Sequence, residues 1–216
     1  MVMSDRPDRA GWTFELLGGR LCLDFANTVS GMRGTDPRDR LGDYADLVDW
    51  GRQAGALDEA QARRLAAEGK RRPEEAARVF AEAIRLREAI YGSFLAFARE
   101  KEPRAEELAV LNEALGRALS HRRVVRGRSC CTLGWEERPG ALDAVLWPVA
   151  ASAAELLVSG DDLSRVRVCG LYEDGECGWL FVDQTRSHTR RWCSMKDCGN
   201  RAKARRHYHR VRGEAS

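Results

Sequence analysis

The amino-acid sequence predicts a mainly α fold with short β-hairpins, in which a helix-rich N-terminal domain precedes a C-terminal treble-clef-like zinc finger. Apolar residues recur at three- and four-residue intervals through most of the chain up to Gly160, which is typical of amphipathic helices. Short extended runs joined by glycine indicate hairpins between the helices. Four cysteines in the last third have the spacing of a zinc site. We place the domain boundary after the acidic turn that ends at Asp162, which gives domains 1–162 and 163–216.

The composition is that of a globular protein, with 44% hydrophobic and 32% charged residues. No apolar stretch reaches the roughly 18 residues of a membrane span, and the polar start of the chain lacks the apolar core of a signal peptide. Seven cysteines are an odd number in a chain of this length, which favours reduced thiols and a metal over a disulfide framework. We therefore expect a cytoplasmic protein that does not contact a membrane.

The first structural element is predicted to be a β-hairpin over residues 12–25, because two extended runs flank Gly18-Gly19, a pair suited to a tight turn. Asp24, Asn27 and Thr28 come at its end and have two interpretations. They could line a ligand pocket, or they could cap the next segment and form buried hydrogen bonds, which is what such residues more often do. We favour the second interpretation and keep Asp24 and Asn27 as a candidate ligand pocket.

Helices follow wherever a capping residue or a proline precedes a periodic apolar run. The longest run, from Pro73 to Lys101, predicts the central core helix. Residues 142–158 predict another apolar helix, which Pro148 either starts or kinks. The other helices are expected to begin at Asp43, Asp58 and Pro103.

A second hairpin is predicted over residues 123–135, around Gly127. Its adjacent Cys130 and Cys131 would point to opposite faces of a strand, so the two are not expected to hold one metal ion.

The zinc site is predicted from the spacing of Cys169, Cys177, Cys193 and Cys198, which leave seven, fifteen and four residues between them. We expect an extended run from Gly178 to Asp183 to pair with residues 190–192 as a hairpin, and a helix to begin near Asn200. A knuckle, a hairpin and a helix that carries the last ligand form a treble clef, in which a structural Zn²⁺ replaces a larger core.

Histidines are weaker candidates for this site. His207 lies nine residues after Cys198, roughly 13 Å along a helix, and its spacing from His209 is not that of a two-histidine finger. His188 is the alternative ligand if Cys169 lies too far from the other thiols.

The C-terminal end is strongly basic. Residues 183–213 carry a net charge of +8, whereas the whole chain carries +3, which leaves −5 for the remainder. Such a split is the electrostatic pattern of nucleic-acid contact, although a merely solvated basic tail is equally compatible with charge alone. On the final helix we expect Ala204, His207 and Val211 to pack on Trp179 and Phe181, with two basic faces outward. The candidate nucleic-acid-binding residues are Arg190, Arg191, Arg201, Lys203, Arg205, Arg206, Tyr208, Arg210 and Arg212. Arg201 could instead hold the hairpin by a hydrogen bond.

These motifs resemble a known family, the CGNR zinc finger proteins with an N-terminal ABATE domain. The matching segments are Cys177–Asp183, Arg190–Met195 and Cys198–Lys203 in the finger, and Leu17–Thr28, Leu86–Ala89 and Leu146–Ala150 in the body. The resemblance covers nearly the whole chain and implies a bacterial transcription regulator with stress-response associations. The loop Gly170–Glu176 is somewhat long for the pattern, which makes Cys169 the least secure of the ligands.

The leading interpretation is therefore a DNA-binding transcription regulator with a structural zinc ion, found in the bacterial cytoplasm and associated with the nucleoid. Alternatives are a zinc-stabilised module that binds RNA or an acidic protein, or a sensor whose helical domain takes a small-molecule effector or forms a homodimer. We expect no enzymatic activity, because four cysteine ligands leave zinc no open position and the body lacks a recognisable catalytic motif.

Overall fold

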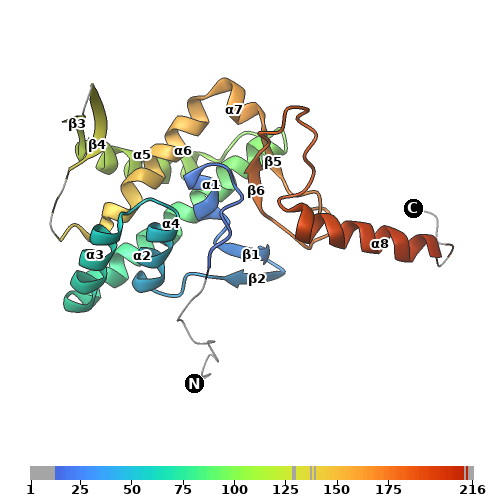
Figure 1. The fold of residues 1–216 in the computed structure, drawn as a ribbon, viewed down its shortest axis with the longest axis horizontal. Coiled ribbons are helices and arrows are strands. Elements are labelled where there is room, and N and C mark those ends of the chain that lie inside the picture. Colours follow the sequence, from blue (N-terminus) through green and yellow to red (C-terminus); the bar gives the residue numbers. More distant parts are fainter. Residues whose placement is uncertain (1–12, 128–129, 137, 139, 212, 214–216) are drawn as a thin grey trace, which may run out of the picture.

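The computed structural model describes residues 13–127, 130–136, 138, 140–211 and 213 of the 216-residue chain. Helices dominate it, and the strands form three separate antiparallel pairs (Figure 1). The helices are α1 (Leu21–Ala26), α2 (Tyr44–Gln53), α3 (Glu59–Arg71), α4 (Pro73–Ala98), α5 (Ala105–Ser120), the 3-10 turn η1 (Leu142–Leu146), α6 (Trp147–Val158), α7 (Gly160–Ser164), the π-turn η2 (Met195–Gly199) and α8 (Asn200–Val211). The strands are β1 (Val29–Met32), β2 (Asp36–Asp39), β3 (Arg122–Arg126), β4 (Cys131–Trp135), β5 (Val166–Val168) and β6 (Leu180–Val182). The predicted fold class, a helix-rich body with short hairpins and a four-cysteine finger, is confirmed.

Local signals place the helices as predicted. The Asp43 carboxylate accepts the backbone N–H of Asp46 at the start of α2. Asp58 and Gln61 form a reciprocal capping box at the start of α3. Pro73 begins α4 and Pro148 lies in the first turn of α6, so this proline starts its helix and does not kink it.

The core forms around α4, the longest helix, which runs through the middle of the body (Figure 1). Its buried face includes Leu86, Ile90 and Phe94, and α5, α6 and α1 contribute to the same core cluster. Phe25 of α1 packs its ring against Trp50 of α2 at a centroid distance of 4.8 Å. No helix in the described part of the chain has the length and apolar character needed to cross a bilayer.

The predicted hairpin over residues 12–25 is wrong, because Leu21–Ala26 form the helix α1. Cys22, Leu23, Phe25 and Ala26 are all buried, which is a helical spacing that the alternating pattern of the sequence had concealed. Gly18 does not form a hairpin turn. Its N–H donates to the Asp24 carboxylate at 2.7 Å, so the glycine pair bends the chain into the helix. The first hairpin is instead β1–β2, which follows α1 directly.

The predicted hairpin over residues 123–135 is confirmed by β3 and β4, which pair in a single register from Arg122 opposite Trp135 to Arg126 opposite Cys131. Cys130 and Cys131 are exposed and lie outside the cluster of buried thiols.

The hairpin predicted within the finger has a different partner strand. Strand β6 pairs with β5, which precedes Cys169, and residues 190–192 form no strand. The reason is the buried Asp183 carboxylate. It accepts hydrogen bonds from the Thr185 N–H, the Thr185 hydroxyl and the Arg190 N–H, and so closes residues 184–189 into a loop.

Candidate metal centre and basic helix

The structure brings together the four cysteines that the sequence singled out. The sulfur atoms of Cys169, Cys177, Cys193 and Cys198 all lie within 4.8 Å of one another, and every one of these side chains is buried. The Sγ–Sγ distances are 3.7 Å between Cys177 and Cys193 and 3.5 Å between Cys193 and Cys198. Four thiolates around a tetrahedral zinc ion, with Zn–S bonds of about 2.3 Å, would lie about 3.8 Å apart. The donor set and its dimensions therefore fit a tetrahedral ion of this kind.

The first two thiols come from the β5–β6 hairpin. Cys169 follows β5, and its N–H donates to the carbonyl oxygen of Trp179 at 2.9 Å, which continues the ladder by one bond. The loop to Cys177 folds back through a turn in which Tyr172 N–H donates to Cys169 O. The loop over residues 170–176 is long for the family pattern, but it returns the chain to the thiol cluster. Cys169 therefore lies within the cluster of four sulfurs.

The last two thiols come from a tight turn before α8. Ser194 caps it by accepting the Asp197 N–H, and the N–H of Gly199 donates to the Ser194 carbonyl oxygen. A Cβ on Gly199 would lie 2.8 Å from the Met195 sulfur, so a side chain there would have to displace the end of Met195. Cys198 is therefore held at the first turn of the helical segment, as the sequence predicted.

Hydrogen bonding among the four sulfurs divides the cluster, because it favours the thiolate at Cys169 and the protonated thiol at Cys177 and Cys193. Hydrogen bonds from Cys177, and then from Cys193 and Cys198, lower the pKa of the Cys169 thiol. The same contact raises the pKa of Cys177, because its proton is held between two sulfurs. Arg201 adds a further donor, since its guanidinium Nη2 lies 3.0 Å from Cys198 Sγ. A cation that displaced these protons would relieve the repulsion between four sulfurs at this distance.

The finger is joined to the body along the outer edge of β6. The Asn27 side chain donates to the Leu180 carbonyl oxygen at 2.8 Å and accepts the Leu180 N–H at 2.9 Å. Two residues further along, Val182 N–H donates to the Gly18 carbonyl oxygen at 2.9 Å. Asn27 and Gly18 thus take the place of a neighbouring strand, a role that the sequence did not reveal.

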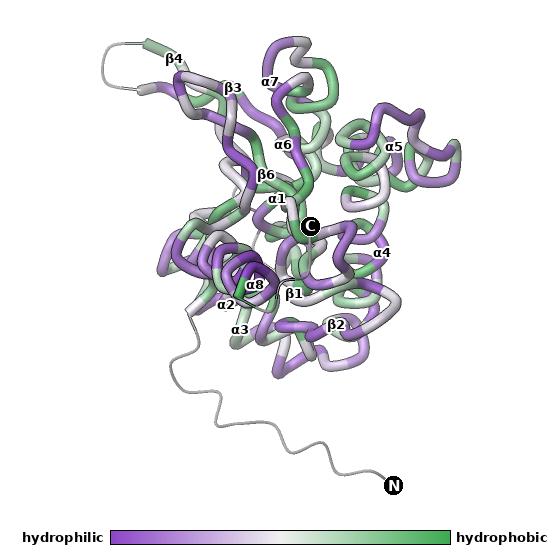
Figure 2. Tube along the Cα trace, turned by 90° about the vertical axis from the view of Figure 1, so that its right-hand side faces the viewer, coloured by the Kyte–Doolittle hydropathy of each residue, from purple (hydrophilic) through white to green (hydrophobic). Residues whose placement is uncertain are grey.

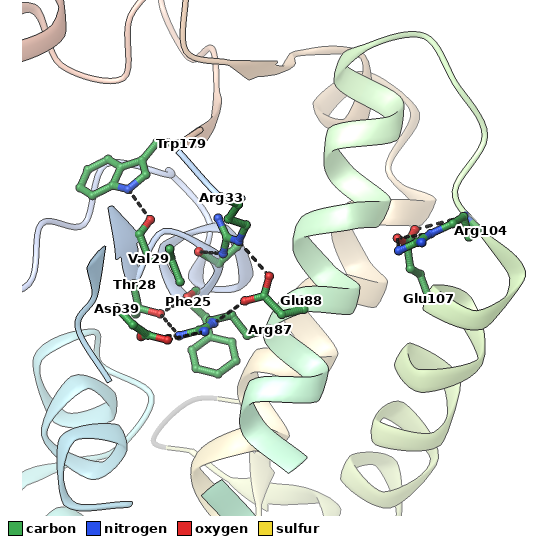
Figure 3. Close-up of polar contacts among 11 residues, drawn as sticks. Phe25, Thr28, Val29, Arg33, Asp39, Arg87, Glu88, Arg104, Glu107 and Trp179 are labelled. Atoms are coloured by element: carbon green, nitrogen blue, oxygen red, sulfur yellow. Dashed lines mark hydrogen bonds and ion pairs between the residues drawn. The ribbon is translucent and has the colours of Figure 1, made fainter. Parts of the chain in front are cut away.

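A second connection runs through Trp179, whose indole N–H donates to the Val29 carbonyl oxygen at 2.9 Å (Figure 3). The neighbouring Gly178 donates its N–H to Gly31, and a Cβ there would lie 2.8 Å from the Tyr91 hydroxyl. The β1–β2 hairpin that receives these bonds is itself tied to α4, because Arg87 binds both carboxylate oxygens of Asp39, at 2.8 and 2.7 Å. Figure 3 shows this row of contacts from α4 to the finger.

Three of the candidate nucleic-acid-binding arginines have partners inside the finger. Arg190 donates to the Trp192 and Cys193 carbonyl oxygens at 3.0 and 2.5 Å. Arg205 forms ion pairs with both Asp174 and Glu176, two acidic residues of the loop between the first two cysteines. Arg201 pairs with Glu176 and with Asp197. The acidic residues of this loop were visible in the sequence, but its fold was needed to show which arginines they neutralise.

The remaining candidates lie on the surface, except Arg212, which is outside the described residues. Lys203, Arg206 and Arg210 follow one another at intervals of three and four and share one exposed side of α8. Among the described residues, none of these three has an acidic group within ion-pair distance, and we call them the cationic face. The other exposed candidates are Arg191 and Tyr208.

The stripe expected to pack on the finger is wrong. Ala204, His207 and Val211 are exposed, and Val211 keeps 71% of its surface. The buried residue is Ala202, which lies four positions after Cys198 and so faces the thiol cluster from the same side of the helix. The C-terminal part of α8 projects away from the rest of the molecule (Figure 1).

The candidate pocket residues Asp24 and Asn27 border a cavity of about 240 Å³ that also touches Phe14, Arg40 and Trp179. Asn27 uses both ends of its amide on Leu180, which confirms the buried hydrogen-bonding role favoured from the sequence. Burial raises the pKa of Asp24 to about 6, against the effect of the Gly18 N–H. His188, the alternative metal ligand, is not part of the thiol cluster and has its Nδ1 near the Asp183 carbonyl oxygen.

Comparison with known families gives two matches. The model of the ABATE family, described as "Putative stress-induced transcription regulator", matches residues 19–160. That of the CGNR zinc finger matches residues 165–211. No curated protein matches the chain.

Proposed function

The chain belongs to the ABATE family and carries a CGNR zinc finger, and on this premise we propose that it is a zinc-dependent, DNA-binding transcription regulator. The observation that carries the proposal is the cationic face of Lys203, Arg206 and Arg210. Three cations without acidic partners, on a helix that projects from the body, are suited to DNA phosphates, and binding would release condensed counterions. We place this regulator in the bacterial cytoplasm, at the nucleoid.

We propose that the resident metal is Zn²⁺ and that its role is structural. Four buried thiols match the preference of zinc for sulfur, and they fill its tetrahedral coordination, so no position remains for a catalytic water. We accordingly propose no enzymatic role. Metal analysis of the purified protein should give about one zinc per chain, which Cys198→Ser should remove. The double variant Cys130→Ser/Cys131→Ser is the control, because these thiols are exposed and outside the cluster, and it should retain the metal.

The DNA proposal is tested by replacing Lys203, Arg206 and Arg210 with alanine and measuring duplex affinity across a range of salt concentrations. Each lost phosphate contact should reduce the slope of log K against log [salt] by about 0.9, so the triple variant should lose up to about 2.7. Affinity at low salt should fall by more than tenfold.

The matched control replaces three exposed cations of α3, namely Arg63, Arg64 and Lys70, and so removes the same charge from the body. It should leave the slope nearly unchanged. Equal losses in both variants would contradict a specific role for α8. Competition among duplex DNA, single-stranded RNA and an acidic protein separates this proposal from an RNA- or protein-binding module, since preference for either competitor would count against it.

A further inference from the structure

The β3–β4 hairpin stands away from the helical body, at the opposite end of the molecule from α8 (Figure 1). Figure 2 shows from a second direction that it projects beyond the helices. Val124 and Leu133 lie directly opposite each other on the two strands and are 71% and 63% exposed. A two-stranded ribbon is marginally stable by itself, and a further strand beside it would add backbone hydrogen bonds and cover the aliphatic pair.

The two edges of this hairpin differ in charge. Strand β3 carries Arg122, Arg123 and Arg126, and arginine or lysine on an edge strand opposes pairing with another chain. Strand β4 is Cys-Thr-Leu-Gly-Trp and has no charged residue. The β4 edge is therefore the one open to a further strand.

The backbone groups available on that edge follow from the observed register. The N–H of Gly127 donates to Cys130 at the tip, and the N–H of Glu136 donates to His121 at the base. Hydrogen-bonded and non-hydrogen-bonded pairs alternate in an antiparallel ladder. The backbone groups of Cys131, Leu133 and Trp135 must therefore point outward, and no strand receives them in the described structure.

We propose that two copies of the chain associate by antiparallel pairing of their β4 strands, centred on Leu133. The two-fold axis places Leu133 opposite the partner's Leu133 and Cys131 opposite the partner's Trp135. All three of these pairs are of the hydrogen-bonded kind and would exchange about six backbone hydrogen bonds. The dimer has a single four-stranded sheet, in which β3, β4 and the two strands of the partner lie side by side.

Side chains favour this arrangement over its alternative. In the four-stranded sheet, Val124 and Leu133 of both copies form one row of four aliphatic side chains on the same face. Pairing through β3, centred on Val124, would place Arg122 opposite the partner's Arg126 twice, and like charges in that position repel. The two α8 helices of the proposed dimer lie at its far ends, because each hairpin is opposite its own α8.

The test is sedimentation of the full-length protein without DNA, so its result does not depend on the proposed function. The wild type should approach 48.4 kDa with rising concentration, twice the 24.2 kDa of one chain. Leu133→Pro removes an outward N–H from β4 and leaves the hydrogen bonds between β4 and β3 intact. It should weaken association at least about tenfold. Val124→Pro is the matched control, because it makes the same change on the outer edge of β3 and should leave the dimer intact. A wild type that remains monomeric, or a dimer lost in Val124→Pro, would overturn the proposal.

A cross-link tests the register independently of hairpin stability. The Cα atoms of Leu133 and the partner's Leu133 would be about 5.5 Å apart, which suits a disulfide. Leu133→Cys in a Cys130→Ser/Cys131→Ser background should therefore give a covalent dimer under mild oxidation with the metal retained. The two native Cys131 residues would be about 14 Å apart and should not cross-link. Rapid cross-linking through Cys131, or none through position 133, would contradict this register.

Discussion

Replacing Asn27 with alanine should weaken the connection between finger and body, because one carboxamide satisfies two backbone groups of β6. The side chain is 3% exposed, and Leu180, its partner, is completely buried. Alanine would leave the N–H and the carbonyl oxygen of Leu180 without partners in a site closed to water. Each such buried group costs about 1–3 kcal/mol, so the free energy of unfolding should fall by about 2–6 kcal/mol.

The assay is urea unfolding at neutral pH with the metal bound, compared with Asn112→Ala on the exposed side of α5, which should change stability by less than about 0.5 kcal/mol. Asn27→Asp keeps the acceptor for the Leu180 N–H but loses the donor and buries a charge, so it should cost at least as much as alanine. A loss below about 1 kcal/mol in Asn27→Ala would refute the assignment of this residue as a substitute for a strand.

Two further predictions concern charged groups of the body. Because burial raises the pKa of Asp24 to about 6 from its ordinary 3.8, the folded protein binds this proton more tightly than the unfolded chain. The free energies of unfolding of the wild type and of Asp24→Asn should therefore be equal near pH 4. As the pH rises through 6, the variant should become the more stable by up to about 3 kcal/mol. A difference in stability that does not change with pH would argue against this titration. Arg87→Met should cost about 3 kcal/mol in urea unfolding, since Arg87 is 3% exposed and joins α4 to Asp39 of β2. Arg85, also on α4, has an exposed ion pair with Glu113 of α5, so Arg85→Met should cost less than about 1 kcal/mol. Similar losses in the two variants would refute the role of Arg87.

Local signals made most of the helices predictable from the sequence. The caps of α2 and α3 and the proline of α4 lie within four residues of the turns they specify, so no tertiary contact is needed to recognise them. Helix α1 could not be recognised in this way. It has only six residues, and it depends on burial against the core and on the bond from Gly18 to Asp24. Tertiary packing decides the structure of such a short segment.

The four cysteines of the candidate site were predictable from the sequence, but the basic residues available on its surface were only partly so. Spacing identified the four cysteines, because zinc sites are commonly built from two cysteine pairs separated by a gap of about this length. Charge alone could not show that Arg205 is paired, since its acidic partners Asp174 and Glu176 lie more than twenty residues away. A count of basic residues therefore overestimated the surface available to a polyanion.

The arrangement of bonds indicates that metal removal will not unfold the finger as one unit. Strand β6 is held by β5 on one side and by Asn27 and Gly18 on the other, and none of these contacts passes through a thiol. The orientation of α8, in contrast, depends on Cys193 and Cys198 and on the ion pairs of Arg201 and Arg205 with a single loop.

Chelation should therefore release α8 while leaving the β5–β6 sheet on the body. Hydrogen exchange measured before and after chelation tests this difference. The amides of α8 and of the turn at residues 195–199 should lose protection, whereas Leu180 and Val182 should keep theirs. In Asn27→Ala the pattern should change, and Leu180 should also exchange rapidly once the metal is gone. Loss of protection at Leu180 in the chelated wild type would mean that the metal, and not the body, holds the sheet in place. Retained protection at Leu180 would instead mean that the body positions the hairpin from which the first two thiols come, so that the start of α8 is fixed by the body as well as by the metal.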